Sequence, residues 1–108
     1  MDRALRAMCT DRVIVHKFLS RSGSGEMIWN SAQPLTLQAF ISRKAKLIRR
    51  ADGKEIVSEH TVILDATPTT LLLALEDLFI FADQRRLRAE SIKVFRGEKN
   101  AEHIEVSF

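Results

Sequence analysis

The clearest pattern along the chain is an alternation of apolar and polar residues over residues 35–47. One face would carry Leu35, Leu37, Ala39, Ile41, Ala45 and Leu47. The other face would carry Thr36, Gln38, Ser42, Lys44 and Lys46, with Phe40 as the exception. A period of two residues predicts one long, half-buried β-strand. Arg43 interrupts the apolar face and predicts a bend or the rim of a barrel at that point.

A turn signal follows this strand. Asp52-Gly53 is the dipeptide that favours a type I′ turn, in which both central residues have a positive φ angle. The return strand then has mainly apolar residues at its even positions, through Ile56, Ser58, His60, Val62 and Leu64. Residues 35–64 are therefore predicted to form a β-hairpin. Its tip is basic and contains Arg49, Arg50, Asp52, Gly53 and Lys54.

Other short segments also predict strands. The β-branched segment 12–19 is the first, and a Gly/Ser-rich loop over residues 20–25 leads to a short strand at 27–29. Segment 86–95 has one slip in its period near Ser91, which suggests a bulge. Segment 103–108 alternates to the last residue.

Residues 67–81 are ambiguous. Thr67 is a suitable N-cap with Pro68 after it, which would give a helix through residues 71–77. Residues 78–81 are all apolar and read as a buried strand. We favour a short helix or turn followed by a strand.

These elements predict a mainly β domain. Five to six strands in antiparallel sequence, with at most one short helix, most economically form a small β-barrel that leaves few exposed edges. The barrel is expected over residues 12–108 as a single domain. Residues 1–11, with Arg3 and Arg6, show no strand period and are expected to be a flexible arm, and loop 20–33 is also expected to be mobile.

Composition excludes several classes of protein. A chain of 108 residues has room for one core. The single cysteine, Cys9, excludes an internal disulfide or a zinc site built on several thiolates, and fits a reducing compartment. The longest apolar stretch, residues 71–75, is too short to cross a membrane, and no signal-peptide pattern opens the chain. Aromatic residues make up only 6% and Tyr is absent, which argues against recognition of bases by stacking.

Charge is distributed unevenly along the chain, although the net charge is only +3. Six of the seventeen Lys and Arg residues lie in 43–54, residues 55–83 hold six acids and no base, and residues 85–99 hold six more bases. One interpretation is chance clustering on solvated surfaces. The other is a dipolar subunit that pairs with copies of itself in a ring.

No constellation of residues predicts catalysis, a metal or a cofactor. His103 and Glu105 share a strand face and would suit a metal or an acid–base pair, but an exposed pair on an edge strand explains them better because no third ligand is placed. Cys9 lacks a partnered His, and Gly23-Ser24-Gly25 lacks the spacing of a phosphate loop. Trp29 is either a core residue beneath the loop or an interface anchor, and we favour the first.

The order of segments resembles that of the head-closure proteins of tailed bacteriophages, also called head-completion, stopper or head–tail connector proteins. The resemblance covers nearly the whole chain after residue 11. It rests on these segments: Gly25-Glu26-Met27-Ile28-Trp29, Leu37-Gln38-Ala39-Phe40-Ile41, the hairpin 50–58, Leu75-Glu76-Asp77-Leu78-Phe79-Ile80 and His103-Ile104-Glu105-Val106-Ser107-Phe108. Asp77 fits a strand entry that is common in this family, whereas Glu76 stands where the family usually has Gly.

The resemblance implies a structural protein of the virion neck that assembles in the host cytoplasm. Such a protein is a monomer when isolated and forms a homo-oligomeric ring beneath the portal or its adaptor. The ring holds the packaged DNA and presents the surface on which tail-completion or tail proteins dock. The basic tip would line the channel, where contact with phosphates needs no reading of bases. The arm and loop would order against adjacent rings, through Arg3, Arg6, Arg21, Gly23, Gly25 and Trp29.

Two alternatives stay open. One is a tail-completion or tail-terminator protein, because related small barrels occur at that position. The other is a small basic β-barrel that binds nucleic acid through the bases of segments 43–54 and 85–99.

Overall fold

The computed structural model describes residues 6–50, 52–96 and 103–108, and these form a mainly β domain of eleven short strands and one 3₁₀ turn. The first six strands are β1 (Asp11–His16), β2 (Phe18–Arg21), β3 (Met27–Trp29), β4 (Leu35–Ser42), β5 (Lys46–Arg49) and β6 (Glu55–Ser58). After β7 (Thr61–Asp65) come the 3₁₀ turn η1 (Thr70–Leu72), β8 (Leu78–Ile80), β9 (Arg86–Arg88), β10 (Ser91–Phe95) and β11 (His103–Ser107). The β class is confirmed. The strand count is higher than predicted because several long segments break into two.

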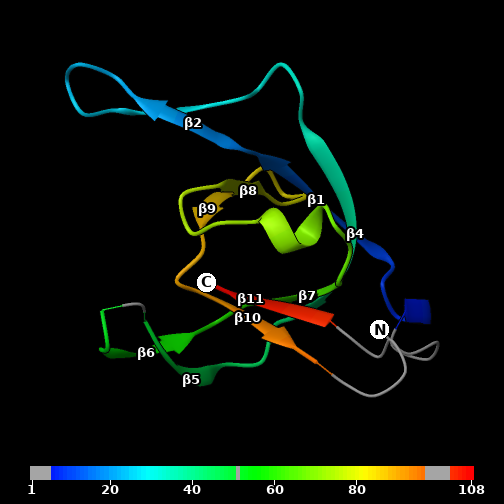
Figure 1. The fold of residues 1–108 in the computed structure, drawn as a ribbon. Coiled ribbons are helices and arrows are strands. Elements are labelled where there is room, and N and C mark those ends of the chain that lie inside the picture. Colours follow the sequence, from blue (N-terminus) through cyan, green and yellow to red (C-terminus); the bar gives the residue numbers. More distant parts are fainter. Residues whose placement is uncertain (1–5, 51, 97–102) are drawn as a thin grey trace.

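Seven strands form one antiparallel sheet in the order β10-β11-β7-β4-β1-β8-β9. The sheet curls strongly, so that it forms a half-barrel with its two ends, β9 and β10, joined by a short link in the chain. Two separate two-stranded hairpins, β2–β3 and β5–β6, extend from it at opposite ends (Figure 1).

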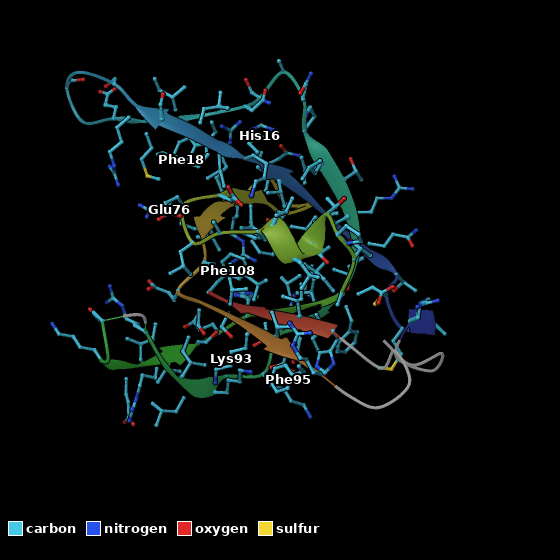
Figure 2. The ribbon with its side chains drawn as sticks, viewed as in Figure 1. His16, Phe18, Glu76, Lys93, Phe95 and Phe108 are labelled. Carbon is cyan, nitrogen blue, oxygen red and sulfur yellow. The ribbon has the colours of Figure 1, made fainter. Side chains whose placement is uncertain are left out.

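The core lies on the concave side of the curled sheet. It is built from alternate residues of the strands: Val13, Val15, Ala39, Val62, Leu64, Phe79, Ile104 and Val106 are all 1% exposed or less. Phe108 lies between the two walls of the half-barrel (Figure 2). Its ring meets those of Phe79 and Phe81 edge to face, with centroids 5.1 and 5.2 Å apart. This packing fixes the C-terminus to the core.

The predicted hairpin over residues 35–64 is confirmed as a long ribbon, in which β4 pairs with β7 and β5 pairs with β6. The predicted bend is also present, because the strand breaks over residues 43–45. Beyond the bend the prediction is wrong: Leu47 is 64% exposed, whereas Ile48 is buried. Ser42 pairs with Thr61 and Lys46 with Ser58, so the outgoing strand has one extra residue. One extra residue exchanges the two faces of a strand.

The tip of this ribbon is not a type I′ turn. The backbone N–H of Arg50 donates to the carbonyl of Lys54 at 2.8 Å, and the N–H of Gly53 donates to the carbonyl of Arg50 at 3.0 Å. These bonds enclose three residues rather than the two of a type I′ turn. Gly53 has a φ of +88°, which suits the left-handed position at the end of a three-residue loop.

Two other predicted elements differ in detail. Only η1 forms where a helix through residues 71–77 was an option, because Leu73 is already extended with a ψ of 140°. The hydroxyl of Thr67 nevertheless accepts the N–H of Thr70 at 3.1 Å, as a cap would. The segment 86–95 is two strands rather than one bulged strand: β9 pairs with β8, and β10 pairs with β11 at the other end of the sheet.

The chain termini of the domain also differ slightly from the prediction. The terminal strand β11 is confirmed, but it lies between β10 and β7 and is not an edge strand. β1 begins at Asp11, inside the predicted arm. Segment 12–19 is two strands, β1 and β2, interrupted at Lys17.

Within the described residues, no helix is long and apolar enough to cross a membrane.

Candidate functional surfaces

The predicted basic tip is largely neutralised by carboxylates of the same chain. Arg50 Nε lies 3.1 Å from Glu90 Oε2, and Arg50 Nη2 lies 3.9 Å from Asp52 Oδ2. Arg49 Nη2 lies 3.9 Å from Glu55 Oε1, and both side chains are exposed. The structure therefore brings the predicted tip residues together, but balances its two arginines against three acids. Lys54 has no acidic partner among the described residues.

Other basic residues of the charge blocks also form ion pairs within the chain. Lys46 Nζ lies 3.2 Å from Glu105 Oε2, and Arg85 Nε lies 2.7 Å from Asp83 Oδ2. A hydrogen bond from the backbone N–H of Arg85 lowers the pKa of Asp83 below its ordinary value. Exposed pairs of this kind contribute little to stability. Part of the segregated charge is therefore already paired within the subunit.

The predicted assembly loop is a projecting hairpin rather than an irregular loop. β2 and β3 pair with each other and with no other strand, and Figure 1 shows them extending beyond the curled sheet. Gly25 has a φ of +88° at the turn, and Arg21 Nη1 donates to its carbonyl at 3.3 Å. Gly23 has open space around it. The hairpin exposes two large apolar side chains, Leu19 at 59% and Ile28 at 43%.

Trp29 anchors the base of this hairpin. Its indole N–H donates to the backbone carbonyl of Glu76 at 2.7 Å, and its side chain is half-buried. Trp29 is not among the described side chains packed in or against the main core, so its role as a core residue or an interface anchor stays a prediction. Figure 2 places Glu76 below the hairpin and near Phe18.

A buried carboxylate that sequence reasoning did not single out for this role holds the same junction. Asp77 is 1% exposed and accepts three hydrogen bonds: from the N–H of Phe18 at 2.8 Å, the N–H of Ala74 at 2.8 Å and Lys17 Nζ at 2.5 Å. Lys17 Nζ also donates to the carbonyl of Leu72 at 2.6 Å. These bonds join the break between β1 and β2 to the segment before β8, and so set the direction of the projecting hairpin.

The N-terminal arm is described only from Arg6, so Arg3 lies outside the described residues. Arg6 Nη2 lies 3.2 Å from Asp65 Oδ2 on β7. Cys9 lies 4.0 Å from the carbonyl of Ile63, to which its thiol donates. Burial, with the nearby Asp65 carboxylate, raises the pKa of the Cys9 thiol. Its thiol is therefore mainly protonated at neutral pH and a poor nucleophile.

The predicted His103–Glu105 pair is present, with His103 Nε2 3.5 Å from Glu105 Oε1. The ring of His103 also stacks on Phe95, with centroids 4.8 Å apart. No cluster of three or more potential metal ligands occurs within residues 6–50, 52–96 and 103–108. The pair lies on the outer face of the inner strand β11, because Ile104 and Val106 face the core, and Lys46 is the cationic neighbour of Glu105.

Three arginines that the sequence reading did not group lie on one outer face. Arg12 lies on β1, and Arg86 and Arg88 lie on β9. The alternation that predicts the strands could also have placed these three arginines on the outer face, because each is adjacent in sequence to a core-facing residue. The hollow beside Arg12 has a volume of about 320 Å³, at the small end for binding sites of small molecules.

Comparison with known proteins adds no relative: no family model matches the chain, and no curated protein matches it. The class that the structure itself defines is a small, curled, antiparallel β domain with two projecting hairpins.

Proposed function

We propose that this chain is a structural protein of the neck of a tailed bacteriophage. In this proposal it forms a ring beneath the portal or its adaptor, closes the DNA-filled head and provides the surface on which the tail docks. The observation that carries the proposal is the β2–β3 hairpin, which leaves the main sheet and exposes Leu19 and Ile28. Projecting apolar elements on a small rigid domain suit contacts between subunits.

Two further features support the same role. The Lys17–Asp77 junction gives the hairpin a defined direction, as an element that must reach a neighbour requires. The order of segments resembles the head-closure family over nearly the whole chain after residue 11, and the observed half-barrel is compatible with that resemblance.

Deletion of the gene tests the proposal, with electron microscopy of the particles and the wild-type protein supplied in trans as the control. We expect tailless heads that lose their DNA. Stable, DNA-filled heads with tails of irregular length would instead indicate a tail terminator. Normal infectious virions would refute a role in the neck.

A pair of matched variants tests the hairpin itself. The double change Leu19→Ser and Ile28→Ser removes its exposed apolar side chains. The control makes the same change at Leu47 and Val57, which are 64% and 63% exposed on the β5–β6 hairpin. Both proteins should fold with unchanged stability, because exposed substitutions usually alter it by less than about 0.5 kcal/mol. Only the first should fail to restore tailed particles, and equal complementation by both would exclude the hairpin as the docking element.

A further inference from the structure

The outer face of the wall formed by β4, β1, β8 and β9 carries an unbalanced group of arginines. Adjacent residues of these strands alternate between core and solvent, so Val13, Val15 and Phe79 point inward while their neighbours point outward. The outward set from this register is Arg12, Ile14, His16, Thr36, Gln38, Phe40, Ile80, Arg86 and Arg88, together with Leu78, which is covered and only 7% exposed. It contains no acidic residue. We call Arg12, Arg86 and Arg88 the arginine face.

The arginine face differs from the two arginines of the predicted tip in lacking ion pairs. Arg12, Arg86 and Arg88 are all exposed, and none has a carboxylate partner among the residues the structure describes. In contrast, Arg49 and Arg50 at the predicted tip lie beside acids of the same chain. The free positive charge of the domain is therefore stronger on this sheet face than on the hairpin tip.

Protection of the sheet edge does not account for the whole group. Basic residues on an edge strand discourage pairing between sheets of different molecules, and β9 is an edge strand. Arg12, however, lies on β1, which is paired with β4 on one side and β8 on the other. An inner strand has no free edge to protect, so the position of Arg12 needs another explanation.

The dimensions of the arginine face fit a phosphate backbone. Arg86 and Arg88 are two residues apart on one strand, or about 7 Å, which is close to two phosphate rises along one DNA strand. Arg12 lies two strands away and two residues further along, because Ile14 pairs with Ile80 and Ile80 pairs with Arg86, so the Cα atoms of Arg12 and Arg86 are about 12 Å apart. Beside Arg12, the side chains of Ile14, Thr36 and Ile80 line a hollow of about 320 Å³ that extends to the turn after β8, and its apolar lining suits the C–H surface of deoxyribose.

We propose that the arginine face binds the phosphate backbone of duplex DNA without regard to sequence. Guanidinium groups bind phosphate oxygens in a two-pronged geometry, which favours Arg over Lys at such positions. Two Phe side chains lie at this face, Phe40 on β4 and Phe81 beside the hollow, but Phe40 is half-buried and Phe81 is 5% exposed. Because neither offers an exposed ring on which bases could stack, contact is made to the backbone alone. Contact with packaged DNA would then be made by this wall of the barrel and not by the tip of the β5–β6 hairpin.

The test measures binding of the full chain to a fluorescein-labelled random 20-base-pair duplex by anisotropy, over a series of salt concentrations. Two variants lose the same charge, each going from a net +3 to 0. The face variant is Arg12→Gln, Arg86→Gln, Arg88→Gln, and the tip variant is Arg49→Gln, Arg50→Gln, Lys54→Gln. A third protein, with Lys at all three face positions, keeps the charge.

We expect the face variant to bind at least about tenfold more weakly at low salt, with a log–log salt slope smaller by about 2 to 3 because three phosphate contacts are lost. The tip variant and the Lys variant should bind more tightly than the face variant. Urea unfolding of each protein verifies the fold. Equal weakening by the face and tip variants, or a greater effect at the tip, would overturn the proposal.

A competition experiment separates DNA from an acidic protein partner. Unlabelled duplex should displace the probe at a lower charge concentration than poly-glutamate does, because DNA has the denser line of charge. If poly-glutamate displaces the probe at the same charge concentration as the duplex does, the face is assigned to an acidic polypeptide and the assignment to DNA is refuted. Absence of binding by the isolated chain would refute this surface alone, since the neck proposal is tested independently by the particles.

Discussion

The carboxylate of Asp77 should be the most sensitive single group in the domain, and Asp77→Asn tests this. The substitution keeps the size and shape of the side chain but replaces one oxygen by an NH₂ group. In the native protein Oδ1 accepts the N–H of Phe18, whereas Oδ2 accepts both the N–H of Ala74 and Lys17 Nζ. Because all of these partners are donors, the new NH₂ group must face at least one of them without forming a bond.

The size of the effect follows from these contacts. If the remaining oxygen stays with Phe18, two hydrogen bonds to a charged acceptor are lost, each contributing about 1.5–3 kcal/mol. In proteins generally, removing one partner of a buried ion pair lowers the free energy of unfolding by about 3–5 kcal/mol, which agrees with this sum. We therefore expect Asp77→Asn to lower the free energy of unfolding by about 3–5 kcal/mol, a large part of the about 5–15 kcal/mol typical of a domain. Lys17→Met should cost less, because Lys17 is 31% exposed and the two backbone bonds to Asp77 persist.

Urea unfolding followed by circular dichroism measures this difference. With a slope of about 1–3 kcal/mol per molar urea, the midpoint of Asp77→Asn should fall by at least about 1 M. The control is Glu59→Gln, which removes an exposed carboxylate with no ion pair among the described residues. In the double variant with Lys17→Met the cost should be less than the sum of the single costs, since the lysine no longer opposes the amide. A midpoint for Asp77→Asn equal to that of Glu59→Gln would refute the reasoning.

Three further outcomes are expected. Gly53→Ala should destabilise by about 1–2 kcal/mol in urea because Gly53 has a φ of +88°, while Gly23→Ala, with open space and no positive φ, should be close to neutral. The raised pKa of Cys9 predicts slower reaction with a disulfide reagent at pH 8 in the folded protein than in urea, and equal rates would contradict it. The lowered pKa of Asp83 predicts a contribution to stability that is present above its unfolded pKa and lost as pH falls through its folded pKa. In an NMR titration, Arg85→Gln should restore this pKa only in part, because the backbone N–H that lowers it most is kept.

Local patterns predicted the strands well where one face packs against the core. Leu35, Leu37 and Ala39 face inward as their alternation indicates, since register is strongly specified when a face is buried. The same alternation was misleading at Ala45 and Leu47. The extra residue at the bend is set by how β4 and β5 pair with different partners, and that pairing has no local signal.

The ion pair between Lys17 and Asp77 could not be predicted from either sequence segment alone. Lys17 and Asp77 are sixty residues apart, and each looks like an ordinary charged residue beside an apolar strand. Their meeting depends on the placement of β1 beside β8, which follows from the order of strands in the sheet. A buried ion pair between distant segments therefore becomes visible only with the topology, although the resemblance had marked Asp77 as the entry to a strand.

The distribution of charge over the folded surface also differs from its distribution along the sequence. The block containing Arg49 and Arg50 is the most basic in the sequence, yet Glu55 and Glu90 lie beside these arginines in the fold. Arg12 stands outside both basic blocks, and the register of β1, β8 and β9 brings it to the same face as Arg86. A phosphate backbone responds to the charge that is left unpaired on a surface, not to the number of bases in a segment. The folded arrangement therefore moves the expected DNA contact from the hairpin tip to the wall of the barrel.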